Sequence, residues 1–400
     1  MLSETYLQKY ADVLVWGLIT ARAGRFRKGD IVSIHYESAA TPLAEALYKN
    51  IIKMGLNAVL RYGMSSSMEK TFYVESGLKQ LKFIPPGDKE FYAGLNGGIH
   101  LRAPESLTHL KEADPKRIGA VALSRKHLRD ILRDREEKGL YGWTSCMMAT
   151  EAMAQHAGMT LKQYEDAIVK ACYLDTKDPV GEWKRILKDS SVIKKWLNKL
   201  PVEKFHVESA NCDLFIKRGK HRRWLGVSGH NIPSFELFMS PDWHETEGVY
   251  YADQPSYRSG NYVEGVKLYF KNGRVEKVDA KTGGDFVRAQ IAIDAGAKSI
   301  GEFSLTDKRF SKINKFMANT LFDENFGGEY GNCHIALGAS YTDTFDGDPS
   351  ALTKKNKVKL GFNDSALHWD LVNTEAKRVS AILEGGGKIV IYENGVFTLN

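Results

Sequence analysis

Apolar residues in the first half of the chain follow two spacings, one typical of amphipathic helices and one typical of buried strands. Residues 4–19 place Leu7, Leu14 and Leu18 on one helical face. Short apolar runs predict a buried strand at 31–36, another strand at 58–62 and a third strand at 98–101. The residues between and after these runs have helical patterns at 41–54, 66–76 and 116–138. Strands that alternate with helices favour a parallel sheet.

The segment 150–199 has an all-helical pattern. Thr160 and Gln163 have the spacing of a capping box before the run 164–172. From residue 181 onwards, apolar residues recur at near-helical spacing, and Pro201 is expected to end this helix.

Beyond residue 203 the pattern changes to strands joined by tight turns. Asn272 and Gly273 follow an alternating run and have the signature of a two-residue hairpin. Asn394 and Gly395 predict a second hairpin at the end of the chain. We therefore predict an α/β domain with a mainly parallel sheet over residues 1–200, and a β-rich α+β domain over residues 201–400.

Composition narrows the class of protein. The 400 residues are 43% hydrophobic and 26% charged, which is typical of a globular chain and excludes intrinsic disorder. No apolar run approaches the ~20 residues that span a bilayer, and the first residues lack the pattern of a signal peptide. Four cysteines without metal-knuckle spacing indicate a reduced compartment. We expect a cytoplasmic protein with no membrane partner.

The net charge of +7 raises the alternative of a basic nucleic-acid-binding protein. The basic runs 217–223 and 354–359 are more typical of solvated loop or hairpin surface, and the run 125–135 is typical of a salt-bridged helix face because acidic residues interrupt it. We therefore expect no nucleic-acid partner.

Two glutamates in the second half are candidate metal ligands. Glu302 is embedded in an apolar, strand-like run, after a helix expected to end near Gly296. A carboxylate in such a run should be paired or coordinate a metal. Glu236 follows a Pro-Ser turn, where a surface glutamate is the commoner outcome.

Two histidines and an aspartate complete the candidate set. His334 stands at the head of an apolar run, after a glycine-rich loop. Its neighbour Cys333 must point to the opposite face if the run is a strand, and we favour His334 as the ligand. His368 and Asp370 are two residues apart, so a strand would place both side chains on one face.

Together these side chains form a mixed nitrogen and oxygen donor set that suits zinc, manganese or cobalt. A single catalytic zinc usually takes three protein ligands. A larger set suits two metals that share a bridging carboxylate, ~3.5–4 Å apart. The alternative is that these residues belong to separate salt bridges. The five candidate ligands are Glu236, Glu302, His334, His368 and Asp370.

At these positions the sequence resembles the aminopeptidase T and aminopeptidase S family of dinuclear metallopeptidases, and the resemblance extends along nearly the whole chain. Five motifs in the same order are much more specific than any one of them. They are the segments 231–241, 301–302, 323–325, 334–338 and 368–370, and weaker similarities lie at 7–11 and 28–30.

The resemblance implies an enzyme that removes N-terminal residues from peptides. It implies two divalent metal ions per chain (zinc, cobalt or manganese), held by the five candidate ligands, and a homodimer whose cavity limits substrate size. Tyr341 would stabilise the oxyanion, and Glu324 would be the general base or an additional ligand. Glu302 is the other candidate for accepting the proton of the attacking water.

The sequence departs from the family pattern beside the expected site. Phe235 replaces a glycine that commonly precedes the first ligand, and the loop 326–332 is longer than usual. A dinuclear phosphoesterase remains an alternative for the same ligands. The sequence around them shows no phosphate-binding glycine loop and no arginine cluster.

Overall fold

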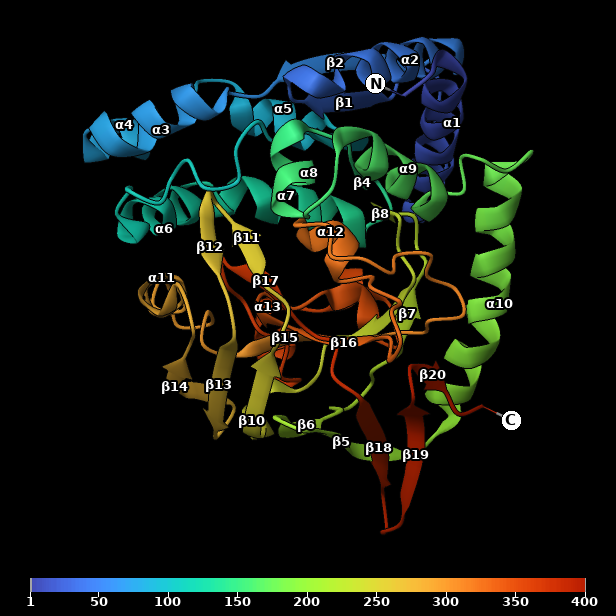
Figure 1. The fold of residues 1–400 in the computed structure, drawn as a ribbon, viewed down its shortest axis with the longest axis vertical. Helices are drawn as coiled ribbons and strands as arrows, with labels where there is room; N and C mark the ends of the chain where they lie inside the picture. Colours follow the sequence, from blue (N-terminus) through green and yellow to red (C-terminus); the bar gives the residue numbers. More distant parts are fainter. Residues whose placement is uncertain (1, 400) are drawn as a thin grey trace.

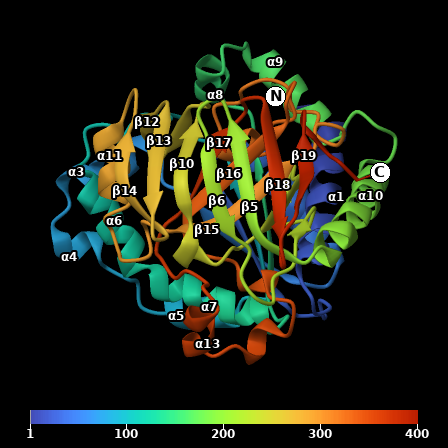
Figure 2. The same cartoon turned by 90° about the horizontal axis from the view of Figure 1, so that it is seen from below.

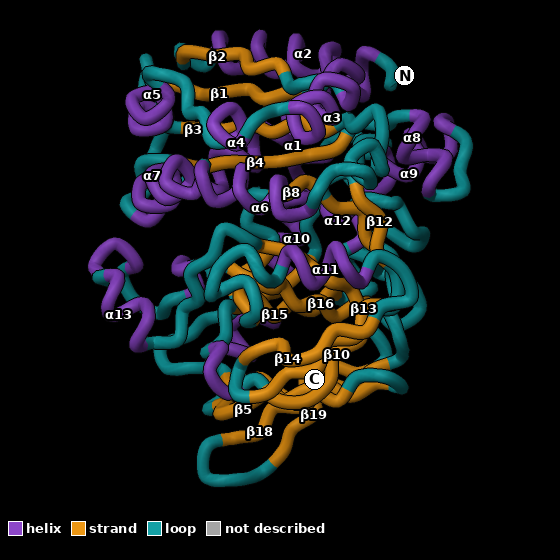
Figure 3. Tube along the Cα trace, turned by 90° about the vertical axis from the view of Figure 1, so that its left-hand side faces the viewer, coloured by secondary structure: helices purple, strands orange, loops and turns teal. Residues whose placement is uncertain are grey.

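Three stacked sheets form the framework of the protein. A computed structural model describes residues 2–399. Figure 3 shows the parallel sheet of the first half at one end, an eight-stranded antiparallel sheet at the other, and a five-stranded antiparallel sheet between them. The predicted α/β first half and β-rich second half are confirmed.

The first sheet has the strand order β2-β1-β3-β4-β8, and all of its pairs are parallel. Its strands are β1 (Ile31–Tyr36), β2 (Asn57–Tyr62), β3 (Gly97–Arg102), β4 (Gly142–Met147) and β8 (Asn231–Ile232). Helices α1 (Glu4–Ala21) and α2 (Thr41–Lys53) pack against this sheet. The sequence pattern did not predict β4, and β8 comes from the second half of the chain.

The remaining helices of the first half surround this sheet and extend toward the second half (Figure 1). They are α3 (Ser66–Glu75), α4 (Leu78–Leu81), α5 (Asp88–Gly94), α6 (Pro115–Ser124), α7 (Lys126–Glu137), α8 (Glu151–His156), α9 (Leu161–Ala171) and α10 (Pro179–Lys199). The capping box at Thr160 and Gln163 is confirmed, because each side chain accepts a hydrogen bond from the other residue's backbone N–H. Helix α10 ends immediately before Leu200 and Pro201, as predicted.

The second half is a sandwich of two antiparallel sheets, which Figure 2 shows with the larger sheet in front. The larger sheet comprises β5 (Val202–Ser209), β6 (Asp213–Lys217), β10 (Glu247–Ala252), β13 (Val266–Lys271), β14 (Arg274–Asp279), β18 (Lys377–Leu383), β19 (Lys388–Glu393) and β20 (Val396–Phe397). The smaller sheet comprises β7 (Leu225–Gly226), β9 (Glu236–Met239), β15 (Ile300–Thr306), β16 (Asn332–Gly338) and β17 (His368–Asn373).

Both predicted hairpins are present, at Asn272-Gly273 and Asn394-Gly395, and these turn residues adopt the positive φ angles that such turns require. A short two-stranded sheet rises from the sandwich toward the first half (Figure 1). The other elements are β11 (Ser256–Arg258), β12 (Asn261–Val263), α11 (Gly284–Gln290), α12 (Thr320–Asp323) and α13 (Lys354–Lys359).

Two local predictions were wrong. The helix expected to end near Gly296 ends at Gln290, because the Asp294 carboxylate accepts the N–H groups of Gly296 and Ala297 and holds a turn there. The basic run 354–359 is a helix rather than a loop or hairpin, and the Thr353 side chain caps its first turn. The division into domains at residue 200 remains a prediction. Within residues 2–399, no helix combines the length and apolar character needed to cross a membrane.

Large aromatic side chains fill the space between the two sheets of the sandwich. Phe205 of the larger sheet lies 5.4 Å from Phe303 of the smaller sheet and 5.5 Å from Trp224, between ring centroids. All three side chains are fully buried. Because Phe303 is the neighbour of Glu302 on β15, this packing also fixes the strand that carries a candidate ligand.

We predict that Phe205→Ala lowers the free energy of unfolding by about 3–5 kcal/mol, since it leaves a cavity between the two sheets. The matched control is Phe215→Ala, whose ring is half-buried and stacks on His206. The control should cost about 1 kcal/mol. Urea denaturation followed by fluorescence measures both. Equal losses for the two variants would contradict a sandwich core centred on Phe205.

Candidate metal centre

Four strands of the smaller sheet place their polar side chains on one face. In the strand register, Ser304 lies opposite His334, and Ala336 lies between Glu302 and Asp370. Cross-strand partners share a face, and so do residues two apart on one strand. The sequence prediction that His368 and Asp370 share a face is therefore confirmed.

His334 lies at the middle of this cluster. Its Nε2 atom is 3.1 Å from Glu236 Oε2, 3.2 Å from Glu302 Oε1 and 3.9 Å from Asp370 Oδ1. His334, Glu236 and Glu302 are all buried. Three carboxylates thus face one imidazole nitrogen in a place where water has little access.

His368 lies on the other side of Glu302. Its Nε2 atom is 3.6 Å from Glu302 Oε2 and 3.5 Å from Asp370 Oδ1. Its Nδ1 atom is 2.9 Å from the Ala339 carbonyl, which fixes the proton on Nδ1 and leaves Nε2 facing the carboxylates. Glu302 therefore faces a different histidine with each of its two oxygens.

The fourth carboxylate, Glu324, belongs to the same cluster, although its segment follows α12 rather than lying in a strand. Its Oε1 atom accepts a hydrogen bond of 3.1 Å from Asn231 Nδ2. The electrostatic effect of Asp370 and Glu236 on Glu324 places it near both. The structure thus brings all five predicted ligands together with the predicted base.

Two polar residues that the sequence analysis did not identify hold Glu236 in place. Ser304 donates a hydrogen bond of 3.0 Å to Glu236 Oε2. The Asn325 side chain accepts the backbone N–H groups of Phe235 and Glu236. Ser304 could have been found from its spacing, because it lies two residues after Glu302 on the same strand.

Tyr341, the predicted oxyanion donor, borders the cluster beyond the end of β16. Its ring packs edge-on against His368, with 4.7 Å between centroids, and its backbone N–H donates to Ser240 Oγ. Burial, followed by the nearby Glu302, raises the pKa of Tyr341 well above 10. Its hydroxyl therefore stays protonated and can donate a hydrogen bond.

Cys333 is excluded from the cluster, as expected from strand geometry. Its side chain is fully buried in the apolar core between the two sheets. Burial raises the pKa of its thiol to about 11, which disfavours the thiolate that metal binding requires.

The charges in the cluster strongly perturb one another. Burial and the neighbouring Glu236 raise the pKa of Glu302 to about 7. Burial and the nearby Asp370 raise the pKa of Glu324 well above its usual value. Burial also disfavours the charged form of Asp370, but the adjacent His368 outweighs it and lowers the pKa to about 2. The four carboxylates of the cluster outnumber its two imidazoles, so the histidines cannot neutralise all of the carboxylates if these are ionised.

This arrangement fits divalent cations. Oxygen and imidazole donors converge on two groups, Glu236-Glu302-His334 and Glu302-His368-Asp370, whose ligand atoms lie within 4.8 Å of one another in each group. Four ionised carboxylates would balance the charge of two dications. Ala336, the small residue between Glu302 and Asp370, leaves room above the sheet. The donor set is the one preferred by zinc, manganese and cobalt.

A cavity of about 270 Å³ opens above the cluster. Glu236, Glu302, Glu324, His368 and Asp370 line it, together with Tyr341. Residues of the first half, including Trp143 and the α7 side chains Arg133 and Glu136, complete its wall. A ligand in this cavity would contact both halves of the chain.

Comparison with known proteins identifies relatives along the whole chain. Aminopeptidase AmpS of Bacillus subtilis (strain 168) is 29% identical over 393 residues, which cover 92% of this chain and 94% of the relative. Aminopeptidase PepS of Streptococcus thermophilus is 24% identical over 416 residues, with 97% of each chain covered. The solved structure of wild-type AmpT from Thermus thermophilus has the same fold, with a TM-score of 0.78 at 19% identity, covering 98% of this chain and 99% of that one.

The family relationship extends over nearly the same range. The profile of the family described as thermophilic metalloprotease (M29) matches residues 3–397. This range includes all four strands of the carboxylate and histidine cluster. The chain therefore belongs to the thermophilic metalloprotease (M29) family.

Proposed function

We propose that this protein is a metal-dependent aminopeptidase that removes single residues from the N-terminus of peptides. The observation that carries the proposal is the convergence of Glu236, Glu302 and Asp370 on two imidazoles beneath a cavity that Glu324 also lines. Membership of a metalloprotease family and relatives named aminopeptidases support it. Neither alternative, a phosphoesterase or a nucleic-acid-binding protein, has support from these relatives.

We propose five ligands for two divalent ions. One ion would lie between Glu236, Glu302 and His334, and the other between Glu302, His368 and Asp370. Glu302 is the member common to both groups, and its two oxygens face different histidines. Glu302 would therefore help to hold both ions, and zinc, cobalt or manganese would each suit the donors.

Bound divalent ions would lower the pKa of a water molecule and polarise the carbonyl of the scissile peptide bond. Glu324 is the better of the two candidate bases, because Glu302 would be occupied in holding both ions. Glu324 would accept the proton of the attacking water on a carboxylate oxygen and return it to the leaving amine. The Asn231 amide, which donates to Glu324 Oε1, orients that carboxylate.

Tyr341 would act on the other side of the reacting carbon. Its protonated hydroxyl can donate a hydrogen bond to the oxyanion that develops from the carbonyl oxygen. Contact with His368 places its ring beside the cluster. A free α-amino group on the substrate would be held by a metal or a carboxylate, which favours cleavage at the first peptide bond.

We also propose a cytoplasmic homodimer. All four cysteines are buried free thiols, which suits a reducing compartment. The arm formed by α3, α4 and the following loop exposes Met68, Leu78 and Phe83, an unusual set of apolar side chains for a monomer surface. A monomeric mass in light scattering would contradict the dimer.

Removal of metal tests the function directly. Dialysis against a chelator should abolish leucine release from Leu-Gly, and added Zn²⁺, Co²⁺ or Mn²⁺ should restore it, because the proposed mechanism relies on bound ions to activate the water. Elemental analysis of the restored protein should give about two ions per chain. Peptidase activity that persists after verified metal removal would refute the mechanism.

Glu302→Ala should lower the metal content more than any other single ligand substitution, since it removes a ligand from both ions. We expect below one ion per chain, whereas His334→Ala and His368→Ala should each retain about one. The matched control is Glu329→Ala, an exposed glutamate outside the cluster. Equal metal content in Glu302→Ala and the control would exclude Glu302 as a ligand.

Glu324→Gln separates the role of base from that of ligand. As the base, Glu324 contributes to proton transfer, and its loss should lower kcat by about 10²–10⁴-fold. Metal content should remain at the wild-type value, because Asn231 can still hold the amide. Elemental analysis and steady-state kinetics of the same preparation measure both. A parallel fall in metal content would make Glu324 a ligand instead.

A further inference from the structure

A second group of charged residues lines the cavity beside the metal cluster. It comprises Arg133 and Glu136 of α7, together with Arg223, His230 and Asp343 from loops of the second half. His230, Asp343, Arg223 and Glu136 influence one another electrostatically and so form one neighbourhood. The proposed chemistry uses none of them.

The acidic residues of α7 already have partners. Glu136 Oε1 is 2.9 Å from His230 Nε2, and His230 Nδ1 is 2.7 Å from Ser228 Oγ. Glu137 pairs with Lys357 at 2.6 Å. These acids are therefore not available to a ligand.

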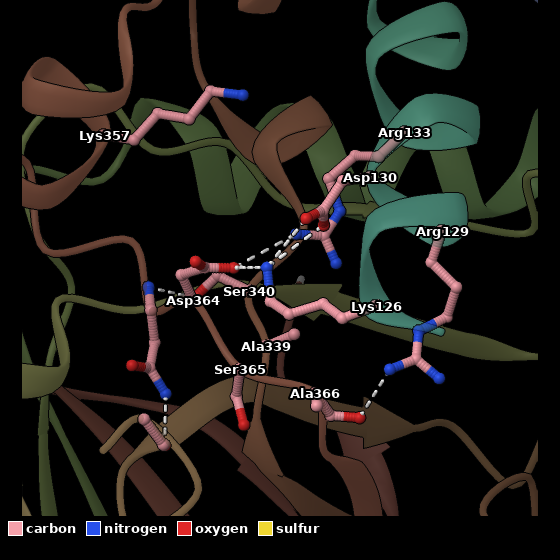
Figure 4. Close-up of polar contacts among 12 residues, drawn as sticks. Lys126, Arg129, Asp130, Arg133, Ala339, Ser340, Lys357, Asp364, Ser365 and Ala366 are labelled. Atoms are coloured by element: carbon pink, nitrogen blue, oxygen red, sulfur yellow. Dashed lines mark hydrogen bonds and ion pairs between the residues drawn. The ribbon is translucent and has the colours of Figure 1, made fainter. Parts of the chain in front are cut away.

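The two arginines are less fully engaged. Arg223 donates from Nε to the Asp343 carbonyl at 3.0 Å, and within residues 2–399 its two terminal amino groups have no partner. Arg133 Nη1 is 3.9 Å from Asp364, a carboxylate that Lys126 holds more closely at 2.8 Å. Figure 4 shows Arg133 and Lys126 approaching Asp364 from the same helix. Both guanidinium groups can thus accept another anion.

Asp343 is the one acid in this neighbourhood with an unpaired oxygen. Its Oδ1 atom is buried without a hydrogen-bond partner in the described chain. Burial and the nearby Glu136 raise the pKa of Asp343 to about 6. Asp343 is therefore still mostly ionised at neutral pH, and the two arginines outnumber this single unpaired carboxylate.

We propose that Arg223, together with Arg133, binds a carboxylate on the leaving side of the substrate, so that short peptides with a free C-terminus are the preferred substrate class. This inference rests on the proposed aminopeptidase function. A guanidinium group pairs with a carboxylate through two parallel hydrogen bonds, which gives both affinity and orientation. The metal cluster would hold the substrate amine, so the two sites in the cavity would together recognise both ends of a short peptide.

The size of the cavity agrees with this substrate class. Its volume of about 270 Å³ lies near the lower end of small-molecule sites, roughly 300–1,000 Å³. The cluster and both arginines line this one cavity, so in this proposal a dipeptide or tripeptide would place its amine at the cluster and its carboxylate at the arginines. A long peptide would carry its terminal carboxylate outside the cavity.

The test compares Leu-Gly with Leu-Gly-amide and Leu-Asp-amide on the metal-loaded protein. Wild type should have a KM for Leu-Gly about tenfold or more below that for Leu-Gly-amide, which is the effect of one charge-assisted pair.

In Arg223→Gln the ratio of the two KM values should fall to about one, and Arg223→Lys should restore part of the wild-type ratio. Arg185→Gln, an exposed arginine on α10, is the matched control and should keep the wild-type ratio. Leu-Asp-amide carries its carboxylate on a side chain instead of at the C-terminus. A lower KM for Leu-Asp-amide than for Leu-Gly would overturn the C-terminal assignment.

Binding measurements separate this inference from the proposed function. Calorimetry with the uncleavable reduced-bond analogues of Leu-Gly and Leu-Gly-amide should show the same tenfold preference without turnover. If binding discriminates and no peptide is cleaved, the function fails and the carboxylate site stands. Equal binding of the two analogues by wild type would overturn the carboxylate site. Preferential binding of Leu-Lys-amide that Asp343→Asn abolishes would also overturn the carboxylate site. The cavity lining around Asp343 would then recognise a basic group.

Discussion

The structure depends on one electrostatic constraint, the crowding of four carboxylates, three of them buried, around one cavity beside two imidazoles. Isolated carboxylates are costly to remove from water, and like charges at short distance increase that cost. The raised pKa values of Glu302 and Glu324 are the direct expression of this strain. Cations between the carboxylates would stabilise their ionised form, so metal binding and the ionisation of these groups are coupled.

The two halves of the chain meet at the segment that carries the first ligand. Asn231 and Ile232 form β8 at the edge of the parallel sheet, and only a few residues later Glu236 begins β9 of the antiparallel sheet. Asn231 also donates to Glu324. Association of the two halves thus sets the position of one proposed ligand and the proposed base, and the first half additionally supplies the α7 wall of the cavity.

Strand periodicity explains what the sequence could predict about the site. His368 and Asp370 share a face because they are two residues apart, and Cys333 points away from His334 because it is one residue apart. Only the family resemblance predicted that ligands on four strands come together, because no local sequence pattern shows which strands are neighbours in a sheet. Neither strand periodicity nor the family resemblance pointed to Arg133, Arg223 or His230 as residues of the cavity. Only the long-range packing of α7 beside loops of the second half brings them there.

In the ligand-bearing strands, one face packs against the apolar core and the opposite face carries the candidate ligands. Phe303, Ile335 and Leu371 alternate with Glu302, His334 and Asp370, and they face the apolar core between the two sheets. That core makes the strands rigid independently of the charged face, since apolar burial needs no ion. The carboxylates are therefore held close together by packing on the opposite side of the sheet. This arrangement explains how a cluster that repels itself can exist ready for metal, and why its ligands lie on strands packed against an apolar core rather than on loops.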